Sequence, residues 1–330
     1  MKVRRKLSRF PNYSKKYTWE MHPVYEMNWL CVSIFINIFE TVTNEEMFMN
    51  AKWLRKNYTG VWSKEKKSLR KDNKRTVSEF ILLRLPIHPE DQGMYSALFL
   101  VMYLTTVLGN LLIILLIRLD SHLHTPMYFF LSHLVTIDIS LSSVTVSKML
   151  KNMQTQDLSI PYADCVTQRY FFILFIDLDN FLLTSVAHDW CVAICHYLLY
   201  TNIMRDELYI SRVAMSWILP RISALSNTLQ LARLSFCANS TFPHFFCDIT
   251  ALMKLSCSDI SPNELVIFTA GTTVITLPLT YILISYGCIE ISFSKISSTK
   301  GICKAFSTYG SQLSVVSLYY DAIIGIYLLL

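Results

Sequence analysis

Four side chains that could bind a metal ion lie close together in the middle of the chain: His188, Cys191, Cys195 and His196. Residues three and four positions apart share one face of a helix, and imidazole and thiolate are ligands that zinc prefers. Thiols at the end of a buried helix are nevertheless far more often packed side chains than metal ligands. We therefore predict no metal site here, and the sequence indicates no cofactor.

The remaining candidate chemistry is that of acids placed in apolar surroundings. The chain has no nucleophile motif, no glycine-rich phosphate loop and no zinc-protease helix, so we predict that it is not an enzyme. Asp138, Asp177, Asp179 and Asp189 each interrupt an apolar stretch. A carboxylate at membrane depth must pair, hydrate or become neutral. Asn110 is a natural hydrogen-bond partner for Asp138. Two interpretations of Asp138 remain open, a structural polar contact and a functional role.

The stretches that hold these acids are long enough to cross a membrane. The chain is 52% hydrophobic and 16% charged, with a mean hydropathy of +0.36, whereas a soluble domain is typically about 25% charged. A helix needs about 20 apolar residues to span the hydrocarbon core. We predict an all-α membrane protein with six such spans, at 94–117, 126–150, 165–194, 213–231, 265–289 and 305–330.

A change in charge divides the chain near Arg75. Residues 1–75 hold 17 Lys and Arg against 7 Asp and Glu, and the remainder holds 13 against 17. We predict a basic, disordered extension over 1–75 and a transmembrane domain over 76–330. The apolar run at 29–39 is too short to span a bilayer. No nucleic-acid fold signature accompanies the basic region, so we expect the lipid bilayer, and no nucleic acid, as a partner.

Charged loops and cysteines indicate the orientation. The short loops at 118–125, 196–212 and 292–304 are rich in Lys and Arg, which places them in the cytoplasm. Four cysteines then face the oxidising side, where disulfides persist, although their pairing does not follow from the sequence. Three glycosylation sequons agree with this topology. The cysteines are Cys165, Cys237, Cys247 and Cys257, and the sequons begin at Asn12, Asn57 and Asn239.

Several ordered blocks resemble one family. The segment 123–132 (LHTPMYFFLS) resembles the start of the second helix of olfactory receptors, which are rhodopsin-like G-protein-coupled receptors. The resemblance covers residues 76–330 and does not extend to 1–75. Further blocks are Gly109-Asn110, 192–196 (VAICH), 234–237 (LSFC), 243–248 (PHFFCD), Ser285-Tyr286 and 304–308 (KAFST).

The resemblance implies a rhodopsin-like helix bundle in the plasma membrane. It implies small volatile odorants as ligands and a heterotrimeric stimulatory G protein as a partner. It pairs Cys165 with Cys247 and Cys237 with Cys257, and it places Asp138 in a sodium-sensitive polar network. By family analogy the odorant site lies between the third, fifth and sixth helices, although each residue there could equally serve helix packing. The candidates are Phe172, Ile173, Ile176, Asp177, Asn180, Gly271, Ile275, Tyr320, Ile324 and Tyr327.

Three departures from the family bear on signalling. In 186–191 (VAHDWC) the family's acid remains as Asp189, but Trp190 replaces the arginine that reaches toward the G protein. We expect weakened coupling and an Asp189 without an ion partner. Pro220 and Arg221 interrupt the fourth span, where an arginine costs about 2.5–3.5 kcal/mol. The sequence ends at Leu330 within the sixth span, so six of the seven helices are expected.

These departures leave two functions open. The first is an odorant receptor whose signalling is weakened or lost. The second is a truncated receptor that does not signal, and that is retained in the endoplasmic reticulum or modulates an intact receptor.

Overall fold

The computed structural model describes the helical body of the chain and short pieces of its loops. Of the predicted sites, Asn12, Asn57, Cys237, Asn239 and Cys257 lie outside the described residues, as do Ile324 and Tyr327. The described residues are 79–82, 90–124, 126–155, 159–196, 199–203, 205–236, 241–242, 247, 252–253, 256, 261–294, 313–314, 316–321 and 323.

Long helices occupy five of the six predicted spans. Each is slightly longer than its apolar stretch, because the helix continues beyond the apolar residues at its ends. Of the sixth stretch, residues 313–314, 316–321 and 323 are described, and they are helical. The long helices are α3 (Gln92–Leu119), α4 (Pro126–Gln154), α5 (Tyr162–Cys195), α7 (Asp206–Ala232) and α9 (Ser261–Ser294), with the short η2 (Ser121–Leu123) and α6 (Tyr200–Ile203) between them.

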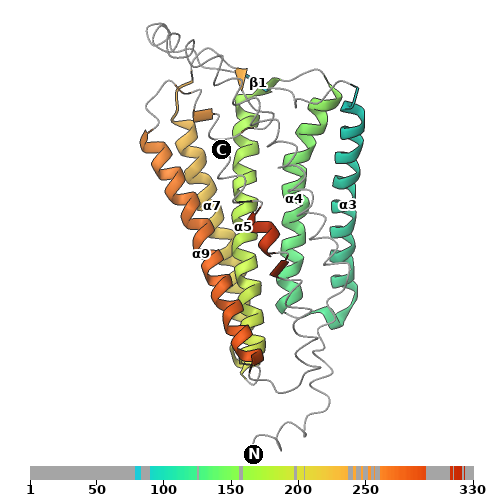
Figure 1. The fold of residues 1–330 in the computed structure, drawn as a ribbon, viewed down its shortest axis with the longest axis vertical. Coiled ribbons are helices and arrows are strands. Elements are labelled where there is room, and N and C mark those ends of the chain that lie inside the picture. Colours follow the sequence, from blue (N-terminus) through green and yellow to red (C-terminus); the bar gives the residue numbers. More distant parts are fainter. Residues whose placement is uncertain are drawn as a thin grey trace, which may run out of the picture.

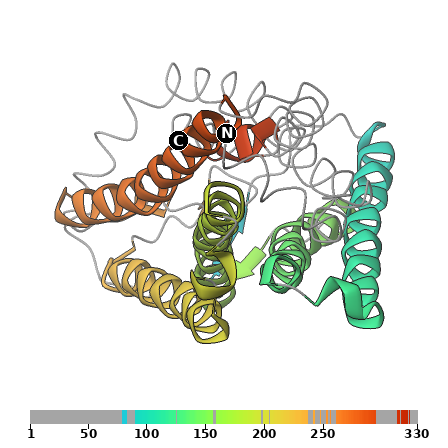
Figure 2. The ribbon, with the colours of Figure 1, turned by 90° about the horizontal axis from the view of Figure 1, so that it is seen from below.

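The helices form an up-and-down bundle with α5 at its centre. In Figure 1, α3, α5 and α9 run from the end that carries β1 to the opposite end, and α4 and α7 run back. We call these the outer and the inner end. α5 packs along α4, α7 and α9, whereas α3 packs against α4; the view along the bundle shows the same arrangement (Figure 2). The predicted all-α helix bundle is confirmed.

The surface of the outlying helices is suited to lipid. Within the part of the chain that the structure describes, four helices are long and apolar enough to cross a membrane: α3, most of α4, α5 and most of α9. Only 22% of the α3 window and 11% of the α9 window is buried, against 56% for α4 and α5. Leu108 on α3 and Phe268 on α9 are more than half exposed. Such a large apolar surface is unfavourable in water, so this surface faces lipid.

Threonine hydroxyls on α9 form hydrogen bonds within the helix itself. The hydroxyls of Thr272, Thr276 and Thr280 each donate to the carbonyl four residues earlier. Lipid offers no hydrogen-bond partner, so a polar group there needs one from the protein. This bonding lets α9 carry its threonines on a face exposed to the membrane.

α7 is the least apolar of the long helices. It is absent from the four membrane-span candidates, and it continues through Pro220. A proline cannot donate to the carbonyl four residues earlier, which here belongs to Ser216. The Arg221 guanidinium lies 5.4 Å from the centre of the Trp217 ring. A cation over an aromatic face is attracted to it, and this contact offsets part of the cost expected for an arginine in this span.

A small sheet at the outer end was not predicted from the sequence. β1 (Glu79–Leu82) pairs antiparallel with β2 (Ser159–Pro161) and parallel with β3 (Thr241–Phe242), so that β1 is central. Phe80 of β1 is buried, and its ring contacts those of Tyr162 and Phe236. The segment before the first span is thereby bound to the start of α5 and to the long loop after α7.

Replacing Phe80 by alanine should destabilise this outer cap. Phe80 is 1% exposed, and its ring centre lies 5.5 Å from that of Phe236. Truncating a buried phenylalanine costs about 3–5 kcal/mol, so the thermal unfolding temperature of the detergent-solubilised protein should fall. Phe171→Ala is the control, because that ring is 40% exposed and contacts the rings of Tyr170 and Phe175 on its own helix. Equal losses in the two variants would contradict the assignment of Phe80 to a buried core.

Candidate functional site

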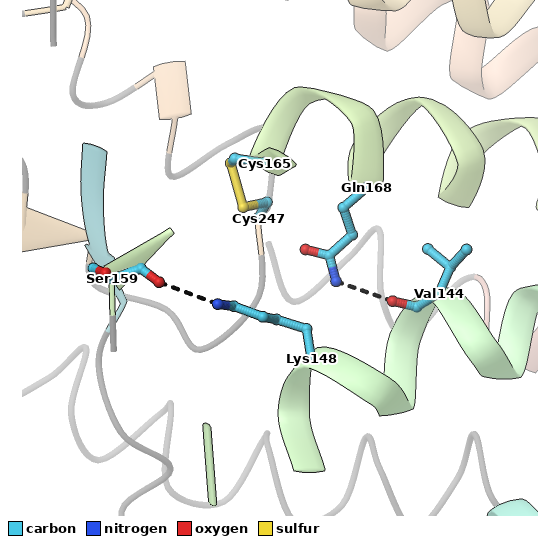
Figure 3. Close-up of a disulfide and its surroundings, with 6 residues drawn as sticks. All are labelled: Val144, Lys148, Ser159, Cys165, Gln168 and Cys247. Atoms are coloured by element: carbon cyan, nitrogen blue, oxygen red, sulfur yellow. Dashed lines mark hydrogen bonds between the residues drawn. A yellow bond between two sulfur atoms is a disulfide. The ribbon is translucent and has the colours of Figure 1, made fainter. Parts of the chain in front are cut away.

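A disulfide fixes the outer end of α5. It joins Cys165, at the start of α5, to Cys247 in the loop before α9, and both side chains are fully buried. Figure 3 shows this bond beside the contacts of α4 with its surroundings. Gln168 Nε2 donates to the Val144 carbonyl at 3.0 Å, and Lys148 Nζ donates to the Ser159 carbonyl at 3.1 Å. The structure thus contains the first of the two pairings that the family resemblance implied.

The five predicted odorant residues of α5 do not share one environment. Ile173 and Ile176 belong to the main hydrophobic core, whereas Asp177 interacts with Ser223 of α7 and with the charge of Arg169. Asn180 is fully buried, and its Nδ2 donates to the Ile176 carbonyl at 3.0 Å. Asp177 therefore faces a neighbouring helix. Phe172 is half-buried, with the Arg169 guanidinium 5.6 Å from the centre of its ring.

Two of the predicted odorant residues on other helices pack on the core that contains Ile173 of α5. Gly271 and Ile275 of α9 are half-buried, and Ile275 packs against the core that contains Ile173. Tyr320 is buried in the same core. Its neighbour Tyr319, which the sequence analysis did not select, donates from its hydroxyl to the Ile176 carbonyl at 3.2 Å. The structure thus brings α5, α9 and the helical segment around Tyr320 together.

The expected contact between Asn110 and Asp138 is wrong. Both side chains are buried, but Asn110 Nδ2 donates to the Thr106 carbonyl of its own helix at 3.0 Å. Within the described part of the chain, no group donates a hydrogen bond to either Asp138 oxygen. The short amide side chain turns back toward the carbonyl one turn earlier and so points away from Asp138 as a donor, while its Oδ1 has no hydrogen-bond partner among the described residues.

Asp138 interacts electrostatically with Asp179, an acid of α5 that the sequence analysis did not select for a site. Asp179 is 1% exposed, and its charge and that of Asp138 act on each other. Tyr319 lies within reach of both charges. The sequence did contain a sign of this pair, because each acid interrupts an apolar stretch and the two stretches are consecutive. Their proximity depends on how α4 packs on α5, which the sequence does not show.

At the inner end, Asp189 has partners on other elements. Its side chain is fully buried, and the Tyr200 hydroxyl of α6 donates to Asp189 Oδ1 at 2.9 Å. The positive charge of Arg212 on α7 also acts on this carboxylate. Asp189 therefore has a hydrogen-bond donor and a positive charge nearby, although its Oδ2 atom has no hydrogen-bond partner among the described residues. The expectation that it lacks an ion partner stays a prediction. Tyr200 and Arg212 lie 11 and 23 residues further along the chain, and only the packing of α6 and α7 against α5 brings them to Asp189.

Trp190, which stands beside Asp189, is directed into the core. It is 6% exposed and packs in the same hydrophobic cluster as Val213 of α7 and Tyr286 of α9. An indole carries one N–H donor and no charge. Trp190 is therefore packed between helices, and it places no positive charge at the inner surface of the bundle.

Of the four residues considered for metal binding, His196 is exposed, and the other three make two kinds of contact. His188 hydrogen-bonds through Nδ1 with the Tyr281 hydroxyl of α9, and the two rings stack. Cys191 and Cys195 contact each other, with 3.9 Å between their sulfur atoms. In the described ranges no group of three or more His, Cys, Asp or Glu side chains is arranged to hold a metal ion.

Comparisons with known proteins agree with the helical architecture. A family model described as olfactory receptor matches residues 99–330. The chain is 69% identical to human olfactory receptor 1J4 over 261 residues, which is 79% of this chain and 83% of the relative. It is 65% identical to human olfactory receptor 1J2 over 257 residues, or 78% and 82% of the two chains. Mouse olfactory receptor 1J1 is 60% identical over 261 residues, or 79% and 83%.

Removing the hydroxyl of Tyr200 should loosen the inner end of the bundle. Tyr200→Phe deletes the donor to buried Asp189 Oδ1, and leaving a buried acceptor with fewer partners costs about 1–3 kcal/mol. The thermal unfolding temperature of the solubilised protein should fall. Tyr209→Phe is the matched control, because Tyr209 contacts Phe129 through its ring. A loss as large in the control would show that the Asp189 bond is not the cause.

Proposed function

The chain belongs to the olfactory receptor family, and from this premise we propose that it binds small volatile odorants while its coupling to a stimulatory G protein is weakened. As a member of that family it is an odorant receptor of the G-protein-coupled type, a multi-pass protein of the plasma membrane and not an enzyme. The observation that carries the proposal is the burial of Trp190 at the position of the family's arginine.

The odorant would bind beside α5, where α9 and the segment around Tyr320 approach it. Pockets for small molecules are mainly apolar with a few placed polar groups. Ile173, Ile176 and Ile275 supply apolar surface, and the Tyr320 hydroxyl is a buried group that has no hydrogen-bond partner among the described residues. This composition favours an odorant that is mostly hydrocarbon and has one hydrogen-bonding group. Phe172, Asn180 and Gly271, with Ile324 and Tyr327, complete the proposed site.

Weakened coupling follows from the chemistry at the inner end. In the family an arginine follows the acid, pairs with it in the inactive state and reaches toward the G protein in the active state. Here Asp189 is held by Tyr200 and by the charge of Arg212, while Trp190 lies in the core. The receptor therefore lacks at this position the cation that would contact the G protein.

The division of the chain into two parts also belongs to the proposal. Residues 1–75 form a basic extension, and residues 76–330 form the transmembrane domain.

A second candidate is a receptor that binds odorants or a sister receptor but does not signal. The same burial of Trp190 favours it, because complete loss of coupling would leave only binding and assembly. Such a protein would stay in the endoplasmic reticulum or alter the surface level of an intact receptor. Co-expression with an intact olfactory receptor, followed by co-precipitation and measurement of that receptor at the cell surface, distinguishes this role from the first.

Trp190→Arg should increase G-protein activation. A charge-assisted hydrogen bond from the new arginine to the G protein would contribute about 1.5–3 kcal/mol. A coupling free energy of about 1–3 kcal/mol between receptor and G protein changes an affinity by about 5–150-fold. Nucleotide exchange on a stimulatory G protein, measured in isolated membranes with an odorant panel, should rise within this range. Isolated membranes contain receptor from all compartments, so retention does not mask the effect.

Trp190→Gln is the control, because it removes the indole without adding a cation. We expect exchange with this variant to stay close to that of the unchanged chain. Strong odorant-evoked exchange by the unchanged chain, equal to that of Trp190→Arg, would overturn the proposal of weakened coupling. Equal increases in both variants would show that the indole itself blocks the site.

A further inference from the structure

Three free thiols gather where α5 and α9 meet at the inner end. Cys191 and Cys195 lie in the last turn and a half of α5, and Cys288 lies near the end of α9. Cys191 and Cys195 are half-buried, and Cys288 is exposed. The cluster therefore includes one exposed thiol and two that are partly enclosed beside it.

The contacts among these thiols cross between the two helices. The Cys195 thiol donates to the Cys288 carbonyl at 3.5 Å, and the Ser292 hydroxyl donates to Cys195 Sγ at 3.1 Å. The Cys191 and Cys195 sulfur atoms lie 3.9 Å apart, and the Cys191 thiol also interacts electrostatically with Cys288. Cys195 contacts the Cys288 carbonyl, so we take Cys191 as the α5 thiol that pairs with the Cys288 thiol.

The cluster lies on the opposite side of the membrane from the structural disulfide. Cys165 and Cys195 stand near the two ends of one 34-residue helix, and a helix rises about 1.5 Å per residue, so a hydrocarbon core about 30 Å thick fits between them. The Cys165–Cys247 bond marks the oxidising side. Cys191, Cys195 and Cys288 therefore face the reducing cytoplasm, where a disulfide is transient and responds to redox conditions.

We propose that Cys288 and Cys191 form a reversible disulfide that joins α9 to α5 at the cytoplasmic side, with a low-molecular-weight disulfide such as oxidised glutathione as the oxidant. The Cys288 thiolate attacks one sulfur of the oxidant, which forms a mixed disulfide and releases one thiolate. The Cys191 thiolate then attacks the Cys288 sulfur and releases the second. The two protein thiols lose two electrons and two protons, and the oxidant takes up both.

The bond would add a covalent link between two helices that otherwise meet through side-chain packing and hydrogen bonds. α5 and α9 also share the His188–Tyr281 hydrogen bond two turns away from Cys195 on α5. With the covalent link closed, the inner ends of α5 and α9 cannot separate. This inference concerns the modification of the chain, and it stands whether or not the receptor couples to a G protein.

The test uses the full chain with a protease site inserted between Ser258 and Asp259 and an epitope tag at each end. Cleavage leaves Cys31, Cys165, Cys191, Cys195, Cys237, Cys247 and Cys257 in the first fragment, and Cys288 and Cys303 in the second. Membranes are treated with oxidised glutathione, capped with N-ethylmaleimide, cleaved and run without reductant. We expect the two fragments to migrate together and to separate when reductant is added.

Four variants identify the pair. The joined band should disappear in Cys191→Ser and Cys288→Ser, and it should persist in Cys195→Ser and Cys303→Ser. Mass spectrometry of the unsubstituted protein should find the peptide that links Cys191 to Cys288, which keeps the test independent of how the variants fold. The absence of both the band and this peptide would overturn the proposal, as would a band that survives in Cys288→Ser or in Cys191→Ser.

Discussion

The packing of α5 against three neighbours is the constraint on which the rest of the bundle depends. α4, α7 and α9 each lie along this helix, and the helical segment around Tyr320 packs on it as well. Lipid gives no hydrophobic drive for helices to associate, so close packing and polar contacts must hold them together. α5 supplies both, with Leu178 and Leu182 fully buried among acids and amides. Its orientation decides what α4, α7 and α9 can contact.

The same helix carries three chemical environments along its length. Its outer end is held by a disulfide and the small sheet, its middle combines core aliphatic residues with Asp177 and Asp179, and its inner end holds Asp189 beside Trp190. Buried carboxylates are costly in an apolar medium. Their concentration on the helix with most protein neighbours is consistent with that cost, because there polar groups of other helices come within reach. Ser223 beside Asp177 and Tyr200 beside Asp189 are examples.

The lengths of the apolar stretches predicted five long helices well. A membrane span must form all its backbone hydrogen bonds within itself, and the thickness of the bilayer sets its length. These lengths could not predict the sheet, since Glu79–Leu82 pairs with strands far away in the sequence. The family resemblance located Asp189, Trp190 and the Cys165–Cys247 pairing. It did not reveal Tyr200 and Arg212 near Asp189, because these contacts depend on how α6 and α7 dock. The expected Asn110–Asp138 contact failed for a local reason, a side chain that bonds to its own helix.

The position of β1 in the middle of its sheet also constrains the order of biosynthesis. Glu79–Leu82 leaves the ribosome before either partner strand exists, and Cys165 is made 82 residues before Cys247. At about 5–20 residues per second, that interval lasts roughly 4–16 s. During this time the strand lacks part of its ladder and the thiol lacks its partner, while the rest of α5 and all of α7 are still being synthesised. The outer cap therefore closes late, and the nascent chain depends on lumenal chaperones and oxidases until the loop after α7 arrives.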